Sequence, residues 1–282
     1  MKVTIAERAG SCYGVERALT LVGKALDEAA GPVRTLGPLI HNPQVVADLE
    51  GRGVTVVDEV PSDAGSTLVI RSHGVVPGVL DQARKRGLVV VDATCPFVQK
   101  AQLAAERLAH DGCQVLVVGE AGHPEVEGIV GHAPGSLVVA SADDVDGLDL
   151  SRKVGLVVQT TQSQALLDEV VCAILPRVDE LDCANTICSA TSERQAAAAE
   201  LADASDVMVV IGGRNSANTG HLAEICQGRC PQTHHIECAD ELDPHWFDGC
   251  DACGITAGAS TPQAQIAEVI ERIHAICDAV GA

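Results

Sequence analysis

The sequence predicts an α/β protein built from three similar units, and three observations lead to this prediction. Short runs rich in valine and isoleucine recur along the chain, at 67–70, 88–92, 114–118, 153–158, 206–211 and 253–257. Amphipathic stretches typical of helices lie between them, for example at 99–112 and 192–205. Cysteines and polar loops recur at matching intervals. Strands that alternate with helices favour parallel sheets, whose ligands bind beyond the carboxyl ends of the strands.

The repeat is clearest when each unit is followed from a cysteine. Cys95 is followed by a predicted helix, a valine-rich strand and a loop that holds His123. Cys188 is followed by the same elements, and Ser216 comes after it by the same 28 positions. Cys12 precedes the helical stretch 13–29, and His41 follows that cysteine by 29 positions. Self-similarity at a fixed period indicates repeated supersecondary units.

A second polar loop follows a later strand in each unit, and these loops are Ser72-His73, Gln159-Thr160-Thr161 and Ala259-Ser260. We therefore expect three similar α/β domains about a pseudo-threefold centre, with boundaries at residues 1–94, 95–187 and 188–282. The amino-terminal strand and the Cys12 loop are assigned to the first domain. In this arrangement Cys12, Cys95 and Cys188 meet at the centre as a three-thiolate site.

Composition excludes several functional classes. Hydrophobic residues make up 46% of the chain, enough for a core without disulfides, whereas aromatic residues make up 1% and leave no stacking platform for single-stranded nucleic acid. The net charge of −20 repels nucleic acids and anionic membranes. The first ten residues contain no apolar signal core, and no stretch approaches the roughly 18 apolar residues that span a bilayer. We expect a cytoplasmic protein, in which twelve cysteines serve core packing, metal binding or catalysis.

Three thiolates suit zinc or an iron–sulfur cluster. Three cysteines from three units, with no fourth equivalent, favour a cubane cluster in which one iron lacks a protein thiolate. Such an iron is a Lewis acid that also carries electrons, and its natural partner is a substrate oxygen that leaves during reduction. Two alternatives remain at this point. The three cysteines are buried small residues, or a zinc site forms elsewhere from Cys226, Cys230, Cys250 and Cys253.

The polar loops indicate an anion site. Loop hydroxyls, amides and backbone N–H groups at helix starts hold phosphate without many lysines. The candidate residues are His41, His73, His123, Ser216, Asn218 and Ser260. The chain contains no GxxxxGK[ST] loop and no complete GxGxxG after a strand, so a nucleotide-binding fold is unsupported.

Glu125 lies two residues beyond His123 and is the candidate proton donor, because a carboxyl group beside a metal centre delivers protons when its surroundings tune it. The alternative is an acid placed at a helix amino terminus for the favourable dipole. Glu127 competes with Glu125 for either role.

Eight motifs, in order, carry a resemblance to a known family: CYGVERAL, HNPQVV, SHGV, DATCPFV, GHPEVEG, QTTQS, NSAN and TAGAS. From about residue 3 to residue 274 the chain resembles the LytB/IspH family, whose members are 4-hydroxy-3-methylbut-2-enyl diphosphate reductases. The resemblance implies a trefoil of three α/β domains around a 4Fe–4S cluster.

The resemblance also implies a role for each candidate residue. Cys12, Cys95 and Cys188 match the cluster cysteines. Glu125 matches the acid that relays protons, Thr160 the threonine near the substrate hydroxyl, and His123 a catalytic, substrate-binding histidine. Further matches to substrate-binding residues are His41, His73, Ser216, Asn218 and Ser260. Ala217 departs from the family, which usually has a second serine there, so one hydroxyl donor to the diphosphate is lost.

The implied chemistry is a two-electron removal of the C4 hydroxyl from a small allylic diphosphate, giving isopentenyl and dimethylallyl diphosphates in the last step of the non-mevalonate pathway. The electrons come singly from a ferredoxin or a flavodoxin. Two other classes of function stay open from the sequence: a non-enzymatic iron–sulfur redox sensor on the same fold, and a zinc-dependent hydrolase that uses the same thiolates.

Overall fold

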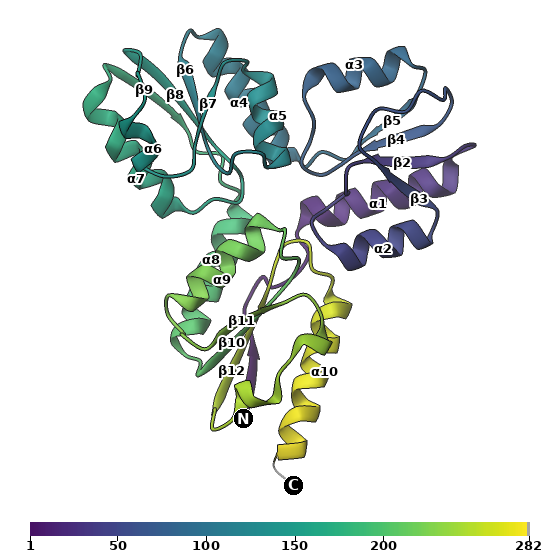
Figure 1. Ribbon diagram of the computed structural model, residues 1–282, viewed down its shortest axis with the longest axis vertical. Coiled ribbons are helices and arrows are strands. Elements are labelled where there is room, and N and C mark those ends of the chain that lie inside the picture. Colours follow the sequence, from purple (N-terminus) through teal and green to yellow (C-terminus); the bar gives the residue numbers. More distant parts are fainter. Residues whose placement is uncertain (281–282) are drawn as a thin grey trace. The chain divides into compact units, whose positions relative to one another are not determined.

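The structure, a computed structural model, describes residues 1–280, with side chains to residue 278. Its strands form three four-stranded sheets, and every strand pairing is parallel (Figure 1). The chain divides into two compact units. The smaller unit comprises Met1–Tyr13, His41–Pro43 and the chain from Ser189 on, and the larger unit comprises Gly14–Ile40 and Gln44–Cys188.

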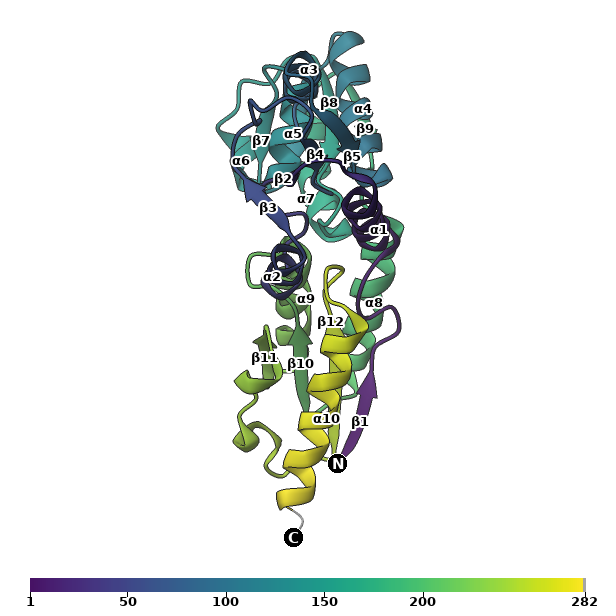
Figure 2. The same cartoon turned by 90° about the vertical axis from the view of Figure 1, so that its right-hand side faces the viewer.

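The smaller unit contains one sheet with helices on both faces. Its strand order is β11 (Thr233–Ile236), β10 (Val207–Ile211), β12 (Ala252–Ala257), β1 (Lys2–Ile5). Figure 2 shows α10 (Gln263–Val280) on one face, with α8 (Ser189–Asp203) and α9 (Ala217–Gln227) on the other. Two short 3₁₀ turns, η2 (Ala239–Glu241) and η3 (Pro244–Phe247), connect β11 to β12.

The alternation of side chains along β10 explains this layering. Val209 and Ile211 pack in one apolar cluster with α10 residues such as Val269. Met208 and Val210 point to the opposite face and pack with residues of α8 and α9. Because successive side chains of a strand point to opposite faces, a strand that is apolar at every position is covered on both sides.

The larger unit contains two sheets of the same design. The order of the first sheet is β3 (Val54–Val57), β2 (Val33–Leu36), β4 (Thr67–Ile70), β5 (Val89–Asp92), and its helices are α1 (Tyr13–Glu28), α2 (Pro43–Gly51) and α3 (Pro77–Lys85). The order of the second sheet is β7 (Leu137–Val139), β6 (Gln114–Val118), β8 (Lys153–Val158), β9 (Glu180–Ala184). Its helical elements are α4 (Pro96–His110), α5 (Pro124–His132), α6 (Asp143–Asp146), α7 (Gln164–Ile174) and η1 (Leu175–Arg177).

The predicted α/β class with three similar units is confirmed by this topology. In each sheet an edge strand runs directly into one of the repeated cysteines: β5 into Cys95, β9 into Cys188 and β1 into the loop of Cys12. The boundaries at 94/95 and 187/188 stay a prediction. One detail of the assignment requires correction, because β1 pairs with β12 and not with a strand of the first sheet. The chain leaves β12 for α10, so the open edge of β12 accepts the amino-terminal strand.

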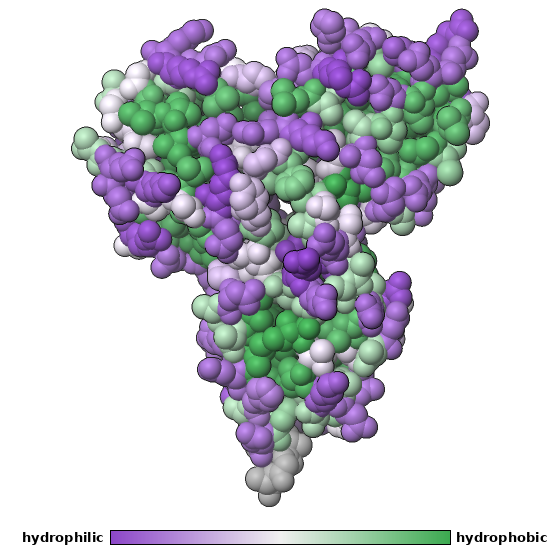
Figure 3. Space-filling view, turned by 180° about the vertical axis from the view of Figure 1, so that it is seen from behind, coloured by the Kyte–Doolittle hydropathy of each residue, from purple (hydrophilic) through white to green (hydrophobic). Residues whose placement is uncertain are grey.

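Hydrophilic and hydrophobic residues alternate over the surface seen in Figure 3. Hydrophilic side chains are spread over the face drawn in Figure 3, and the hydrophobic residues seen there lie in separate areas between them. Within residues 1–280 no helix combines the length and the apolar character needed to cross a bilayer.

Candidate functional site

The candidate residues lie at the carboxyl ends of the strands. In both sheets of the larger unit the chain leaves two adjacent central strands toward opposite edges, and these pairs are β2 and β4, and β6 and β8. The corresponding central pair of the smaller unit is β10, which leads to β11, and β12, which leads to α10 on the other face of the sheet. The loops that follow such a pair flank a topological switch point, which is where open α/β sheets bind their ligands. The two polar loops predicted for each unit are the loops of these pairs.

The three repeated cysteines share one backbone contact. Each backbone N–H donates to a carbonyl of a second polar loop, and the bonds are Cys12 to Ala259 at 3.1 Å, Cys95 to Ser72 at 2.9 Å and Cys188 to Thr160 at 3.0 Å. Each cysteine directly precedes a helix, whose amino terminus favours a negative charge such as that of a thiolate. At Cys95 the backbone is extended and Pro96 takes the first helical position, so the turn is preorganised.

The donor set fits an iron–sulfur cluster. All three side chains are partly exposed thiols outside any disulfide, and soft thiolates are the ligands that such clusters take. Cys12 belongs to the smaller unit, whereas Cys95 and Cys188 belong to the larger one. Among residues 1–278 no three His, Cys, Asp or Glu side chains are grouped closely enough to hold a metal ion. The meeting of the three cysteines therefore stays a prediction.

The other nine cysteines range from buried to exposed. Among the described side chains no metal-holding group is found at the carboxyl-terminal cysteines, and Cys253 packs in a different apolar cluster from Cys226 and Cys230. Cys226 and Cys253 are buried, and this burial raises the pKa of each thiol to about 12. A raised pKa disfavours the thiolate, which is the nucleophilic form of cysteine. Cys172 lies at an apolar position of the helical pattern, which predicts a core residue, but it is exposed on α7, so this prediction is wrong.

Glu125 and Thr160 form a buried pair in the larger unit. Glu125 is 2% exposed at the start of α5, and Thr160 follows β8. The Thr160 backbone N–H donates to Oε1 of Glu125 at 2.6 Å, and the Thr160 hydroxyl donates to Oε2 at 3.0 Å. Burial raises the pKa of Glu125 to about 7 even though these two bonds favour the charged form. The carboxyl group therefore exchanges a proton near neutral pH, as a general acid requires. Its competitor Glu127 is exposed.

Two histidines lie beside this pair. His123 caps α5, and its Nδ1 accepts from the backbone N–H of Glu125 at 3.1 Å. Because Nδ1 accepts, the neutral ring carries its proton on Nε2. The ring of His73 packs edge-on against His123, with ring centroids 5.6 Å apart.

In the smaller unit the loop after β10 provides an unsatisfied amide. Ser216 caps α9, with its hydroxyl accepting from the backbone N–H of Thr219 at 3.4 Å. Asn218 is 4% exposed, and neither atom of its side-chain amide has a hydrogen-bond partner among the described residues. A buried amide without a partner is costly, so it marks a place for a ligand. Ala217, the first residue of α9, is half-buried between them.

A buried polar network holds the neighbouring loop. The Ser260 hydroxyl donates to the backbone carbonyl of His41 at 3.0 Å. The amide of Asn42 donates to the carbonyl of Ser260 at 2.9 Å and to Oε1 of Gln265 at 3.1 Å. Gln265 in turn donates to the carbonyl of Glu237. Sequence reasoning missed this network. Asn42 could have been identified from the sequence, since it adjoins His41 in the HNPQVV motif, but Gln265 and Glu237 carry no local signal.

The close approach of residues 41–43 to this site depends on one glycine. A Cβ at Gly213 would lie 2.7 Å from the carbonyl oxygen of His41 and 3.3 Å from the Pro43 ring. The structure therefore brings His41, Ser260 and the Ser216–Asn218 loop together in the smaller unit. Within the larger unit it brings Glu125, Thr160, His123 and His73 together.

These observations define a protein of three parallel sheets with a cysteine after one edge strand of each and polar groups at the switch points. The chain belongs to the LytB protein family, which matches residues 3–274.

Particular relatives narrow the comparison. A 4-hydroxy-3-methylbut-2-enyl diphosphate reductase from Geobacter sulfurreducens is 52% identical over 275 residues and covers 97% of each chain. The enzyme of the same name from Geotalea uraniireducens is 50% identical over 277 residues, with 98% of each chain covered. A solved structure of (E)-4-hydroxy-3-methyl-but-2-enyl diphosphate reductase, the terminal enzyme of the non-mevalonate pathway, is 45% identical with a TM-score of 0.73 and covers 97% of this chain and 99% of that one. The structure of the Plasmodium falciparum reductase has a TM-score of 0.91 at 26% identity and covers 95% of this chain and 86% of that one.

Proposed function

We propose that this protein converts 4-hydroxy-3-methylbut-2-enyl diphosphate to isopentenyl and dimethylallyl diphosphates, the terminal reaction of the non-mevalonate isoprenoid pathway. The reaction takes two electrons and two protons, breaks the C4–O bond and releases water. The observation that carries the proposal is the buried Glu125–Thr160 pair, with a carboxyl pKa of about 7, in a chain that shares half its residues with reductases of this name.

Glu125 supplies the proton that lets the hydroxyl leave as water. Its protonated form predominates below pH 7, and its burial keeps the proton away from bulk water. Thr160 orients the carboxyl group through two bonds and presents its own hydroxyl beside it. His123, whose Nδ1 is occupied by a backbone N–H, directs an Nε2–H donor toward the substrate. His73 packs on that ring and limits its rotation.

The diphosphate is bound by the polar set of the smaller unit together with the histidines. The amide of Asn218 donates to a phosphate oxygen, which satisfies a buried group that has no hydrogen-bond partner within the described part of the chain. Ser216 and the free backbone N–H groups at the start of α9 add donors, and the helix dipole favours the negative charge. Ser260 and His41 complete the set. Because the diphosphate end of the substrate is held in place, the allylic fragment attached to it is oriented as well.

Cys12, Cys95 and Cys188 would hold a 4Fe–4S cluster, which supplies single electrons and an iron with an open position for an oxygen ligand. The equivalent backbone contacts of these three cysteines support this assignment. Two electrons delivered singly require two encounters with a carrier, and we assign a ferredoxin or a flavodoxin to that role.

The test is anaerobic purification followed by an assay with the hydroxylated diphosphate and a one-electron reductant such as reduced methyl viologen. We expect brown protein with close to four irons and four sulfides per chain, and formation of both C5 diphosphates. Stoichiometric zinc without sulfide would instead support a hydrolase. Iron and sulfide without any conversion of the diphosphate would support a redox sensor.

A further inference from the structure

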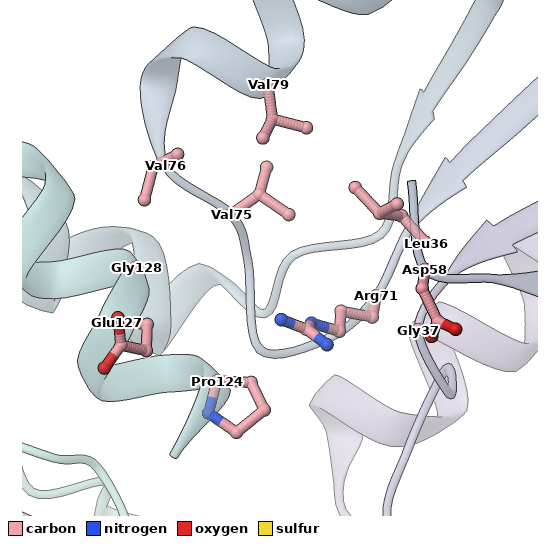
Figure 4. A pocket seen from close by; sticks show the side chains of 10 residues that line it. All are labelled: Leu36, Gly37, Asp58, Arg71, Val75, Val76, Val79, Pro124, Glu127 and Gly128. Carbon is pink, nitrogen blue, oxygen red and sulfur yellow. The ribbon is translucent and has the colours of Figure 1, made fainter. Parts of the chain in front are cut away.

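A cavity of about 250 Å³ opens at the carboxyl edge of the first sheet of the larger unit (Figure 4). Leu36 and Gly37 line it where β2 ends, and Arg71 lines it where β4 ends. These two strands are the pair that flanks the switch point of this sheet, which is the position where open α/β sheets bind ligands. None of the residues assigned above to the reductase site lines this cavity.

Arg71 is a half-buried cation without a protein partner. In the described part of the chain its guanidinium makes no ion pair or hydrogen bond, and its Nε is buried. Other arginines of this acidic protein do pair, such as Arg107 with Asp182 at 2.9 Å and Arg229 with Asp203 at 2.7 Å. Burial lowers the pKa of Arg71, which reflects the cost of keeping this charge away from water. A charge in that position is stabilised by an anion that enters the cavity.

The backbone leaves space for the guanidinium. Gly37 has φ +70°, in the left-handed region that favours glycine, and a Cβ there would collide with Nη1 of Arg71. Figure 4 shows the Arg71 side chain extending from the end of β4 between Pro124 on one side and Gly37 on the other. The guanidinium thus lies in the lining of the cavity, and the two parallel N–H groups at the edge of an arginine suit a carboxylate bound through both oxygens.

The opposite wall is apolar. Val75, Val76 and Val79 lie together at the start of α3 and face the cavity in Figure 4. Val76 is held closely against α5, because a Cβ at Gly131 would collide with its side chain. Branched aliphatic side chains with few rotamers form a fixed surface, which suits a small branched hydrocarbon.

Two exposed carboxylates, Asp58 and Glu127, complete the lining. Neither lies within ion-pair distance of Arg71. Together with Arg71 they give the cavity one positive and two negative charges. A phosphate with two charges is repelled more strongly by this pair than a carboxylate with one.

We propose that this cavity binds a small organic monoanion, with its carboxylate on the Arg71 guanidinium and a short branched hydrocarbon on the three valines. The volume is sufficient for five or six carbons, since a cavity of roughly 150 Å³ holds benzene. Arg71 directly precedes Ser72, whose carbonyl accepts from the N–H of Cys95, so an occupant of the cavity adjoins the loop of a proposed cluster ligand.

The experiment is titration calorimetry on the anaerobically purified full chain with two matched probes, 4-methylpentanoate and the neutral 4-methylpentan-1-ol. The acid should bind at least about tenfold more tightly than the alcohol. Arg71→Gln should lower the affinity for the acid about 10- to 100-fold and change the affinity for the alcohol by less than about twofold, because only the charged hydrogen bonds are removed. The affinity of Arg71→Lys for the acid should lie between those of wild type and Arg71→Gln, since lysine keeps the charge but lacks the two parallel N–H groups. Val79→Ser should lower the affinities for both probes by a similar factor.

Arg272→Gln, the same substitution at an exposed site on α10, is the control and should leave both affinities unchanged. Equal affinities for acid and alcohol, or acid binding that Arg71→Gln and Arg71→Lys both leave intact, would overturn the proposal. Displacement of the acid by pyrophosphate in an Arg71-dependent manner would also overturn it, because the cavity would then prefer a multiply charged phosphate. These measurements involve no turnover, so they stand independently of the reductase assay.

Discussion

Glu125→Gln tests the central residue of the proposed reaction through protein stability as well as turnover. The pKa of this carboxyl rises from an ordinary value of 4.5 to about 7 on folding, and desolvation is the largest cause. A raised pKa means that the folded state holds the proton more tightly than the unfolded state. The wild-type protein therefore carries no ionisation penalty below pH 4.5, and loses stability as the pH rises toward 7.

The size of the penalty follows from the shift. Each pKa unit corresponds to about 1.4 kcal/mol, so complete ionisation of Glu125 costs the folded state about 3 kcal/mol. Glutamine keeps the shape and cannot ionise. Between pH 5 and pH 8 the unfolding free energy of Glu125→Gln should therefore rise relative to wild type by about 2–3 kcal/mol. Solvent does not screen this ionisation penalty, because Glu125 is only 2% exposed.

The assay is urea unfolding of iron-free protein at several pH values for wild type, Glu125→Gln and Glu127→Gln. Glu127 lies on the same helix but is exposed, so its variant should follow the wild-type curve at every pH. A constant difference between Glu125→Gln and wild type across this range would show that Glu125 ionises normally, and the proton-relay argument would then fail. Turnover of the cluster-loaded Glu125→Gln variant should fall by about 10²-fold or more, whereas Glu127→Gln should be mild.

The remaining predictions concern the cluster and the diphosphate. Serine at Cys12, Cys95 or Cys188 should remove most of the iron, because a hydroxyl is a poor ligand for iron, while serine at the exposed Cys172 should retain it in a colorimetric iron assay. Ala217→Ser should tighten pyrophosphate binding about 2- to 10-fold by adding a donor, and Ser216→Ala should weaken it; unchanged affinities in both would place the diphosphate elsewhere. Gln265→Leu should break the link from Asn42 to Glu237 and weaken pyrophosphate several-fold with iron content intact, whereas loss of iron would point to general unfolding.

The architecture could be predicted from the sequence because its signals are local. Valine-rich runs mark buried strands, helical periodicity marks what lies between them, and equal spacing marks equivalent positions. The second polar loops are also local, since each directly follows its strand. All three of these loops accept a hydrogen bond from a repeated cysteine, as their matching positions in the units imply.

What only the tertiary structure decided depends on contacts between distant segments and on burial. Pairing of β1 with β12 joins residues about 250 positions apart, and edge-strand pairing leaves no mark on either sequence. Glu125 and Glu127 are two positions apart on one helix, yet helical geometry buries the first and exposes the second. Desolvation then sets the pKa that suits Glu125 to its proposed role as proton donor. Likewise, the sequence shows Arg71 as one basic residue among nineteen, and only the fold reveals that no carboxylate of the described residues pairs with it.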